Sequence, residues 1–236
     1  MAYGIIKSPL LVRATPSYFK TVSGTPAGLN IVTDITLEAW INLTTLPSGN
    51  TYGVIAHPNN SGSSAGAYNF RIFESGGTQS IHFVRSNAGT QIISANWSPS
   101  TGIWYHIAVT HNTSTGAAVI YVDGSSIGTA TNATVGDGDS SPTFVGMNGP
   151  GLEHPMNGRT SLVRIWSVVR TQAEIAANMC VVFGQAMTNM EAEWTLDDVL
   201  TDNSTNSNSL TNVNSVVFAS NVPSVCFPFV PQMNII

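Results

Sequence analysis

The sequence contains few charged residues: Asp, Glu, Lys and Arg make up 9% of its 236 residues, whereas they form about a quarter of an average soluble domain. The two lysines and six arginines are scattered along the chain, and the formal net charge is −5. No basic patch is therefore available to bind nucleic acid. No apolar run reaches the length of a membrane span, which excludes a transmembrane helix.

A secretory signal peptide is also missing from the first twenty residues, because Pro9 and Arg13 interrupt their apolar stretch. Polarity comes instead from Ser, Thr, Asn and Gly, a composition that is typical of β-sandwiches with long polar loops. Such chains are common outside cells and on virus particles. We therefore expect an extracellular or virion-surface location, reached through a signal that was removed or by lytic release of a particle.

Cysteine and histidine, two residue types that often bind metals, are sparse. Cys180 and Cys226 allow one disulfide or two buried free thiols, and the sequence does not decide between them. The five histidines show no zinc-binding spacing. The sequence therefore predicts no zinc site.

Alternating apolar residues predict strands along most of the chain. In "DITLEAWINL", Ile35, Leu37, Ala39 and Ile41 share one face. Between apolar strands, Asp123-Gly124 predicts a tight hairpin turn, because glycine tolerates a positive φ. About a dozen strands of this kind indicate an all-β fold, an antiparallel jelly-roll β-sandwich.

One short helix is expected after the strand "TSLVRIWSVV". Thr171, followed three residues later by Glu174, forms a capping-box pattern. The sequence shows no linker and no internal repeat, so we predict a single domain over 1–236 with its core at about 18–218. The extensions 1–17 and 219–236 are candidate docking segments, since the apolar end "CFPFVPQMNII" favours being covered in an assembly.

The order of several segments resembles a known family. "ITLEAWINL", "WYHIAVTHNTSTGAAVIYVDGSSIG", "FVGMNGPGLEHPMNGRTSLVRIWSVVRTQAEI" and "MEAEWTLDD" follow the pattern of LamG-like jelly rolls. These domains belong to the concanavalin A-like lectin/glucanase superfamily, alongside laminin G and pentraxin domains. The resemblance covers roughly residues 18–218 and specifies the fold better than the function, because this fold hosts hydrolases, lectins, adhesion modules and virion proteins.

The resemblance implies structural roles for His106 and Asp123, a buried histidine and a turn residue. Laminarinase-like enzymes of this fold carry an E-x-D-x-x-E pattern, which this chain lacks. Its one glutamate pair, Glu191 and Glu193, shares a strand face. Both carboxylates are expected to point outward into solvent, with Trp194 on the core side. We therefore expect no enzymatic activity, and a degenerate glycosidase is the weakest alternative.

Relatives of the laminin G and pentraxin type bind calcium at a rim of the sandwich, so the resemblance implies a calcium site. Calcium takes six to eight oxygen ligands. Asp137 and Asp139 in "VGDGDSS" are the candidate ligands, since two carboxylates flank a flexible glycine. The loops 148–157 and 197–203 offer further carboxylate and amide oxygens.

Sugar-binding proteins combine a few polar groups with an aromatic platform. Trp97, in "SANWSPSTG", is the candidate stacking ring, and the alternative is that it caps the core. Tyr52 and Tyr68 border loops and are further candidates, whereas Trp40, Trp104, Trp166 and Trp194 are expected in the core.

Two functions therefore remain open, and they are compatible. The first is a surface-displayed module for carbohydrate binding or adhesion, with glycans or cell-surface polysaccharide as partners and calcium as a cofactor. The second is a purely structural decoration protein of a virion, bound to capsid, tail or fibre proteins or to other copies of itself.

Overall fold

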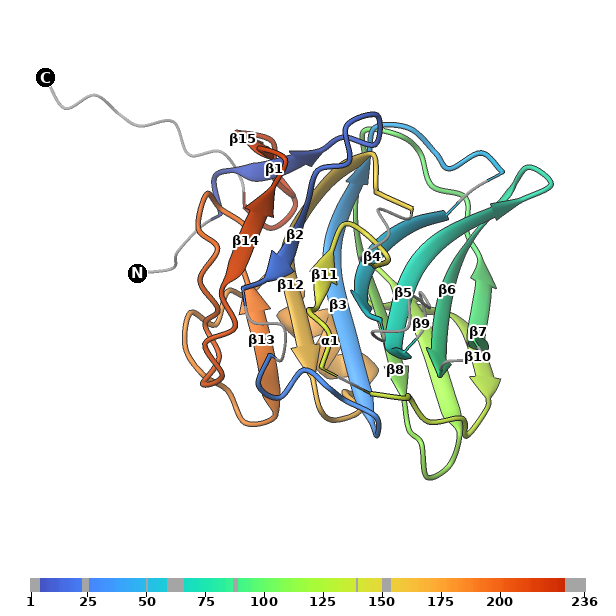
Figure 1. Cartoon of the computed structure of the whole chain (residues 1–236). Coiled ribbons are helices and arrows are strands. Elements are labelled where there is room, and N and C mark those ends of the chain that lie inside the picture. The colour runs from blue at the N-terminus through green and yellow to red at the C-terminus, as the bar shows by residue number, and fades with distance from the viewer. Residues whose placement is uncertain are drawn as a thin grey trace, which may run out of the picture.

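The computed structural model describes residues 5–22, 26–49, 51–58, 66–86, 89–138, 140–149 and 154–227. Two antiparallel sheets face each other and enclose the main hydrophobic core (Figure 1). One short helix accompanies them in the described part of the chain. The predicted all-β jelly-roll sandwich with a single short helix is confirmed.

The first sheet has eight described strands and forms the back layer of Figure 1. Seven of them follow the order β10-β9-β8-β3-β12-β1-β15, and β13 pairs with the last part of β12. Their bounds are β1 (Ser8–Leu11), β3 (Ile35–Leu43), β8 (Trp104–His111), β9 (Ala117–Val122), β10 (Ser125–Thr131), β12 (Gly158–Trp166), β13 (Met190–Trp194) and β15 (Val217–Ala219).

The second sheet has seven described strands in the order β14-β2-β11-β4-β5-β6-β7. Their bounds are β2 (Tyr18–Thr21), β4 (Thr51–His57), β5 (Gly66–Ser75), β6 (Thr78–Ser86), β7 (Thr90–Asn96), β11 (Phe144–Val145) and β14 (Leu210–Val213).

The central strand β3 shows why the sandwich forms. Its alternate residues Ile35, Leu37, Ala39 and Ile41 are fully buried between the sheets, as predicted. The other face of β3 is buried as well, so every residue of the strand is buried. The outer face of the eight-stranded sheet must therefore be covered by further chain.

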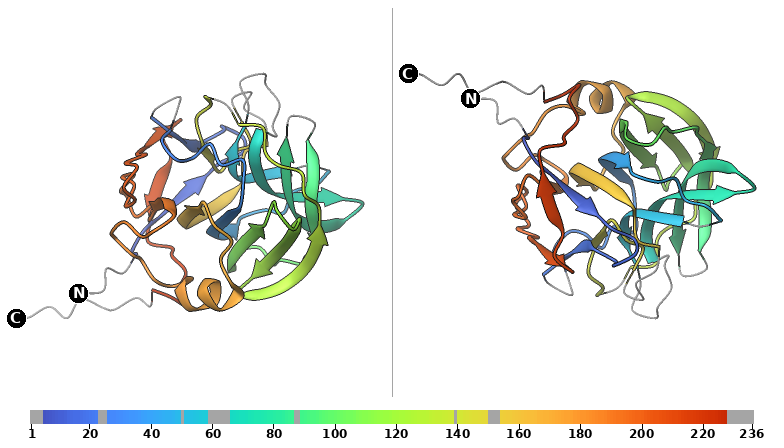
Figure 2. Two further views of the ribbon diagram at one scale, coloured as in Figure 1. Left: turned by 90° about the horizontal axis from the view of Figure 1, so that it is seen from below. Right: turned by 90° about the horizontal axis from the view of Figure 1, so that it is seen from above.

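The helix α1 (Gln172–Asn178) and the segment after it supply that cover. Thr171 accepts a hydrogen bond from the backbone of Glu174, whose side chain accepts one from the backbone of Thr171, so the predicted capping box is confirmed. The buried side chain of Ile175 packs against Ala108 and Tyr121 of the eight-stranded sheet. Figure 2 shows the helix on the opposite side of the molecule from the seven-stranded sheet.

Both ends of the described chain belong to the fold, so the prediction that 1–17 and 219–236 are extensions is wrong for residues 5–17 and 219–227. Strand β1 pairs with β12 and β15 inside the eight-stranded sheet. Ile5, Leu11 and Phe227 are buried. Residues 1–4 and 228–236 lie outside the described part. No described helix has the length and apolar character needed to cross a membrane.

Candidate functional site

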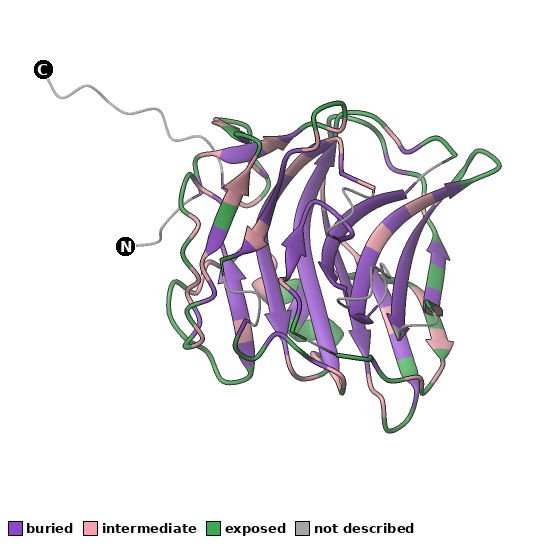
Figure 3. Ribbon diagram, viewed as in Figure 1, coloured by how far each residue is buried: buried purple, intermediate pink, exposed green. Residues whose placement is uncertain are grey.

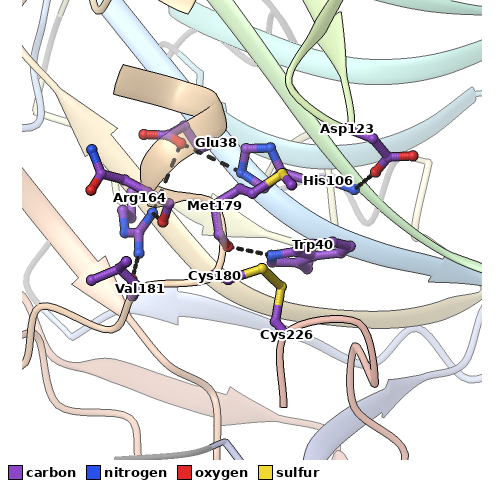
Figure 4. Close-up of a disulfide and its surroundings, with 10 residues drawn as sticks. Glu38, Trp40, His106, Asp123, Arg164, Met179, Cys180, Val181 and Cys226 are labelled. Carbon is purple, nitrogen blue, oxygen red and sulfur yellow. Dashed lines mark hydrogen bonds and ion pairs between the residues drawn. A yellow bond between two sulfur atoms is a disulfide. The ribbon is translucent and has the colours of Figure 1, made fainter. Parts of the chain in front are cut away.

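A buried cluster of charged side chains lies between the eight-stranded sheet and the segment that follows α1 (Figure 4). Arg164 donates from Nε to Glu193 Oε2 at 2.9 Å, and its Nη1 lies 3.9 Å from Glu38 Oε2. His106 Nε2 lies 3.4 Å from the same Glu38 oxygen. All four side chains are at most 1% exposed. These side chains pair with one another, so the cluster is an internal ion network.

Glu38 is ionised inside this cluster. Burial alone would raise its pKa, but the neighbouring His106 and the positive charges of Arg164 and Arg170 outweigh burial and hold the pKa below its ordinary value. Trp166 also donates its indole N–H to Glu38 Oε1 at 2.7 Å. The carboxylate therefore serves as an internal counter-ion that joins β3, β8 and β12.

The expectation that Glu191 and Glu193 both face solvent is wrong for Glu193, which is fully buried. Its carboxylate accepts hydrogen bonds from Arg164, from Asn203 and from the backbone of Phe183 and Gly184. The segment 178–184 covers this face of β13, which strand alternation could not reveal. The half-buried Glu191 accepts bonds from two side chains, those of Ser167 and Asn206. Neither carboxylate is placed as a free acid or base for glycoside cleavage.

The structure gives His106 and Asp123 structural positions, but the two ring nitrogens of His106 form no hydrogen bond with the described residues. The ring of His106 packs edge-on against Trp40, with centroids 5.4 Å apart. Asp123 has φ 48° and precedes Gly124 with φ 75°, which is the predicted hairpin turn. Asp123 Oδ1 also accepts a hydrogen bond from the backbone N–H of His106 at 2.8 Å.

The two cysteines form a disulfide, which settles the alternative that the sequence left open. The bond joins the segment after α1 to the C-terminal turn and lies beside the indole of Trp40 (Figure 4). Trp40 donates its indole N–H to the Met179 carbonyl oxygen at 2.6 Å. The disulfide therefore fastens the cover of the eight-stranded sheet, and it is typical of a protein that functions outside the cell.

The outer face of the seven-stranded sheet differs, because no described helix or sheet lies over it. One row of residues crosses four strands on this face: Gly53 pairs with Arg71, Arg71 with His82, and His82 with Ser94. Three strand spacings make the row about 14 Å long. A Cβ on Gly53 would collide with Asn148 Oδ1, so the Asn148 amide lies directly over the first position of the row.

Polar groups in this row lack partners. Both amide atoms of the fully buried Asn148 make no hydrogen bond to the described residues. The same is true of Arg71 Nε and of His82 Nδ1. The ring of Phe73 lies next to His82, with centroids 4.7 Å apart. Buried polar groups are normally paired, so this row is the candidate ligand site. The strands that carry its first three positions, β4 to β6, are largely buried (Figure 3).

His82 is neutral at physiological pH. Burial and then the charge of Arg71 lower its pKa from 6.5 to about 4. Its Nε2 and the Ser80 hydroxyl are 2.9 Å apart, which orients the ring. The imidazole can therefore exchange hydrogen bonds with a ligand without bringing a second positive charge next to Arg71.

Acidification should destabilise the protein through His82. Between pH 6.5 and about 4 the unfolded chain binds a proton at this position that the folded chain does not, so the free energy of unfolding falls as the pH falls through this window. Urea unfolding at several pH values should show a steeper loss for the wild type than for His82→Gln. If the free energy of unfolding of the two proteins fell equally with pH, the lowered pKa of His82 would be contradicted.

The structure places the predicted aromatic residues away from this row. Tyr68 is fully buried and donates its hydroxyl to the Leu29 carbonyl oxygen at 2.9 Å. Tyr52 is 3% exposed and bonds to Thr45. Neither ring offers a face for stacking, so the prediction that these two tyrosines bind a ligand is not supported.

Trp97 is half-buried, and its ring packs edge-on against Tyr105 with centroids 5.0 Å apart. The indole contacts the main core, as in the alternative in which it caps the sandwich. It lies on the opposite side of β7 from Ser94, and its role in sugar binding stays a prediction.

The predicted calcium ligands are only partly described. Asp137 is exposed, and Asp139 lies outside the described residues. Among the residues that the structure describes, no three His, Cys, Asp or Glu side chains gather as a metal site. In the loop 197–203, the Asp202 carboxylate accepts bonds from the backbone of Glu193, Ser204 and Asn208. Calcium binding through Asp137 and Asp139 therefore stays a prediction.

Sequence reasoning missed Arg71 and His82, and it offered the loop that begins at Asn148 only as a source of calcium ligands. A signal was present for the first two, since "NFRIFES" and "SIHFVRS" alternate and place Arg71 and His82 on the face opposite the core. No pattern indicated that Asn148 folds back over β4, because that contact depends on a loop distant in sequence.

Comparison with known proteins agrees with this architecture. The family model described as "Concanavalin A-like lectin/glucanases superfamily" matches residues 16–176, which is more than half of the chain. A search of curated protein sequences finds no match.

Solved structures share the fold at low sequence identity. A candidate carbohydrate-binding protein from Bacteroides ovatus is 22% identical with a TM-score of 0.70; the match covers 92% of this chain but 60% of that protein, so the chain spans less than two thirds of it. A heptameric pentraxin from Limulus polyphemus is 16% identical with a TM-score of 0.65, and the match covers 95% of this chain and 99% of the pentraxin chain.

Domain 4 of an extracellular arabinanase from Geobacillus stearothermophilus, in complex with arabinotriose, is 17% identical with a TM-score of 0.50, and the match covers 72% of this chain and 75% of that domain. At these identities the likeness concerns the fold. On the family match and this shared architecture, the chain belongs to the concanavalin A-like lectin/glucanases superfamily.

Proposed function

We propose that this chain is a non-catalytic carbohydrate-binding module, displayed outside the cell, that binds glycans on the outer face of its seven-stranded sheet. The observation that carries the proposal is the set of unpaired polar groups over β4 to β6, those of Asn148, Arg71 and His82. Nearly all buried polar groups in folded proteins have partners. A ligand rich in hydroxyl groups could supply those partners, as saccharides do.

Two further features support this function over catalysis. The one glutamate pair is held in internal hydrogen bonds, so Glu191 and Glu193 are not placed on either side of a bond to be cleaved. Two structures of the same fold are described as a candidate carbohydrate-binding protein and as a domain in complex with arabinotriose.

A glycan array tests the proposal, run once with calcium and once with a chelator. We expect saturable binding to a defined class of sugars. If the chelator abolishes it, calcium belongs to the site, with Asp137 and Asp139 as the first ligands to replace. A blank array under both conditions would contradict carbohydrate binding for the glycans tested.

Asn148→Leu should separate binding from stability. Leucine has nearly the shape of asparagine, and it removes an amide whose two polar atoms are buried without partners. We expect glycan binding to weaken at least about tenfold, while the free energy of unfolding stays constant or rises by about 1 kcal/mol. Titration calorimetry and urea unfolding measure the two effects.

Trp97→Phe is the matched control, because phenylalanine keeps an aromatic contact with Tyr105 and lies outside the row. Unchanged glycan binding in this variant supports a binding site on the outer face of the seven-stranded sheet. Loss of binding in Trp97→Phe but not in Asn148→Leu would move the site to the rim, as the sequence alone suggested.

A structural role in an assembly is the second candidate. Large apolar side chains are exposed next to β1 and β15 and in the C-terminal turn, namely Ile6, Val217 and Val225. Apolar side chains that gather into one exposed surface mark protein contacts. We propose that these three supply such a surface for docking onto a larger particle, including a virion, and a blank array would favour this role over glycan binding.

A further inference from the structure

Arg71 is a half-buried cation with no counter-charge. It lies on the outer face of β5, between Phe70 and Ile72, which point into the core. Its guanidinium forms no hydrogen bond and no ion pair with any described residue, in contrast to that of Arg164 on the opposite sheet. Burial lowers the pKa of Arg71 below its ordinary value, but a guanidinium remains protonated at neutral pH.

A charge that is removed from water without a partner is costly. Arginines elsewhere in this protein avoid that cost: Arg85 is fully buried, and its guanidinium donates to three backbone carbonyl oxygens, those of Ala67, Thr33 and Ile31. Arg71 has no such ligands. Arg170 Nε is also buried without a hydrogen bond, but its guanidinium pairs with Glu174 and lies over the Trp166 ring. Arg71 has neither kind of partner among the described residues, and it lies in the row already singled out as the binding face.

The surroundings of Arg71 complete an anion site. The neutral His82 lies directly across from it on β6, and the Asn148 amide lies over Gly53 on the other side. Phe73 lies two residues after Arg71 on β5, and its side chain is half-buried. No described Asp or Glu lies within ion-pair distance of the guanidinium.

We infer that the glycan bound by this face carries a carboxylate, and that Arg71 is its anchor. This inference rests on the proposed function and specifies its ligand class. The guanidinium presents parallel N–H donors that match a carboxylate in two-pronged geometry. Asn148 and His82 then bind neighbouring hydroxyl groups, and Phe73 covers an apolar face of the sugar ring.

Titration calorimetry with paired probes tests the ligand class. The probes are an oligogalacturonate and the same oligosaccharide with its carboxylates reduced to alcohols, together with sialyllactose and lactose. We expect the wild type to bind at least one acidic probe about 10- to 100-fold more tightly than its neutral partner, since hydrogen bonds to charged groups contribute more than those between neutral ones.

Arg71→Met should lower the affinity for the acidic probe to that for the neutral one, while Arg71→Lys recovers only part of the loss. Lys20→Met is the control, because Lys20 is another cation on the outer face of this sheet, on β2 and away from the row. Its affinity should stay within about twofold of the wild type. Arg71→Met should still fold, because it loses no bond within the described chain.

Three outcomes would overturn the inference. Equal affinity for acidic and neutral probes contradicts the ligand class but leaves glycan binding intact. Equal losses in Arg71→Met and Lys20→Met indicate unspecific attraction of anions. If no acidic probe binds, the inference fails, and the neutral glycans of the array decide separately whether the proposed function stands.

Discussion

Replacing Arg164 by methionine should destabilise the protein by about 3–5 kcal/mol, the cost of leaving a buried charge without its partner. Two buried carboxylates, Glu193 and Glu38, would lose the cation between them. The Asn178 and Val181 carbonyl oxygens, which accept bonds from the same guanidinium, would lose their donor. Urea unfolding measured near neutral pH should show a lower midpoint with an unchanged slope.

Arg159→Met provides the matched control on the same strand. Arg159 is only part-buried and donates to the Ser8 carbonyl oxygen at 3.0 Å, so its loss should cost about 1 kcal/mol. Equal losses in the two variants would contradict the central place of the charged cluster. The double variant Arg164→Met/Glu193→Gln should lose less than the sum of the single changes, because both act on one ion pair.

Removing the disulfide should lower the free energy of unfolding by about 2–4 kcal/mol. Cys180 and Cys226 are 46 residues apart, and closing a loop of this length restricts the unfolded chain by about 4 kcal/mol. The cover of the eight-stranded sheet would also lose its link to the C-terminal turn. Calorimetric unfolding of Cys180→Ser/Cys226→Ser, compared with the wild type, measures the change.

Reductant separates the disulfide from the side-chain replacement. It should lower the melting temperature of the wild type towards that of the double serine variant and leave the variant itself unchanged. Identical melting of the oxidised and reduced wild type would show that the bond does not stabilise the fold.

The sandwich could be predicted from the sequence because its core obeys strand alternation. In β3, the spacing of Ile35, Leu37, Ala39 and Ile41 specified the core face, and Thr171 with Glu174 marked the start of α1. The same alternation misplaced Glu193, because a strand pattern separates two faces but does not say whether a distant segment covers the polar one. The segment after α1 does so here, and its disulfide was one of two open alternatives.

The candidate site was less accessible to sequence reasoning. Loop aromatics drew attention to Tyr52, Tyr68 and Trp97, yet the ends of strands turn these rings towards the core. The row that combines Arg71 with Asn148 depends on strand register and on a loop folded over β4. Register follows from the whole sheet, so it cannot be read from either segment alone.

An NMR titration can locate the glycan site residue by residue. The ¹⁵N-labelled protein would be titrated with the glycan that binds most strongly on the array, and amide shifts would be mapped onto the fold. We expect the largest shifts at Gly53, Arg71, His82 and Ser94, the row across β4 to β7. Shifts confined to Trp97 and Tyr105, or to the loop around Asp137, would contradict binding on the outer face of the seven-stranded sheet.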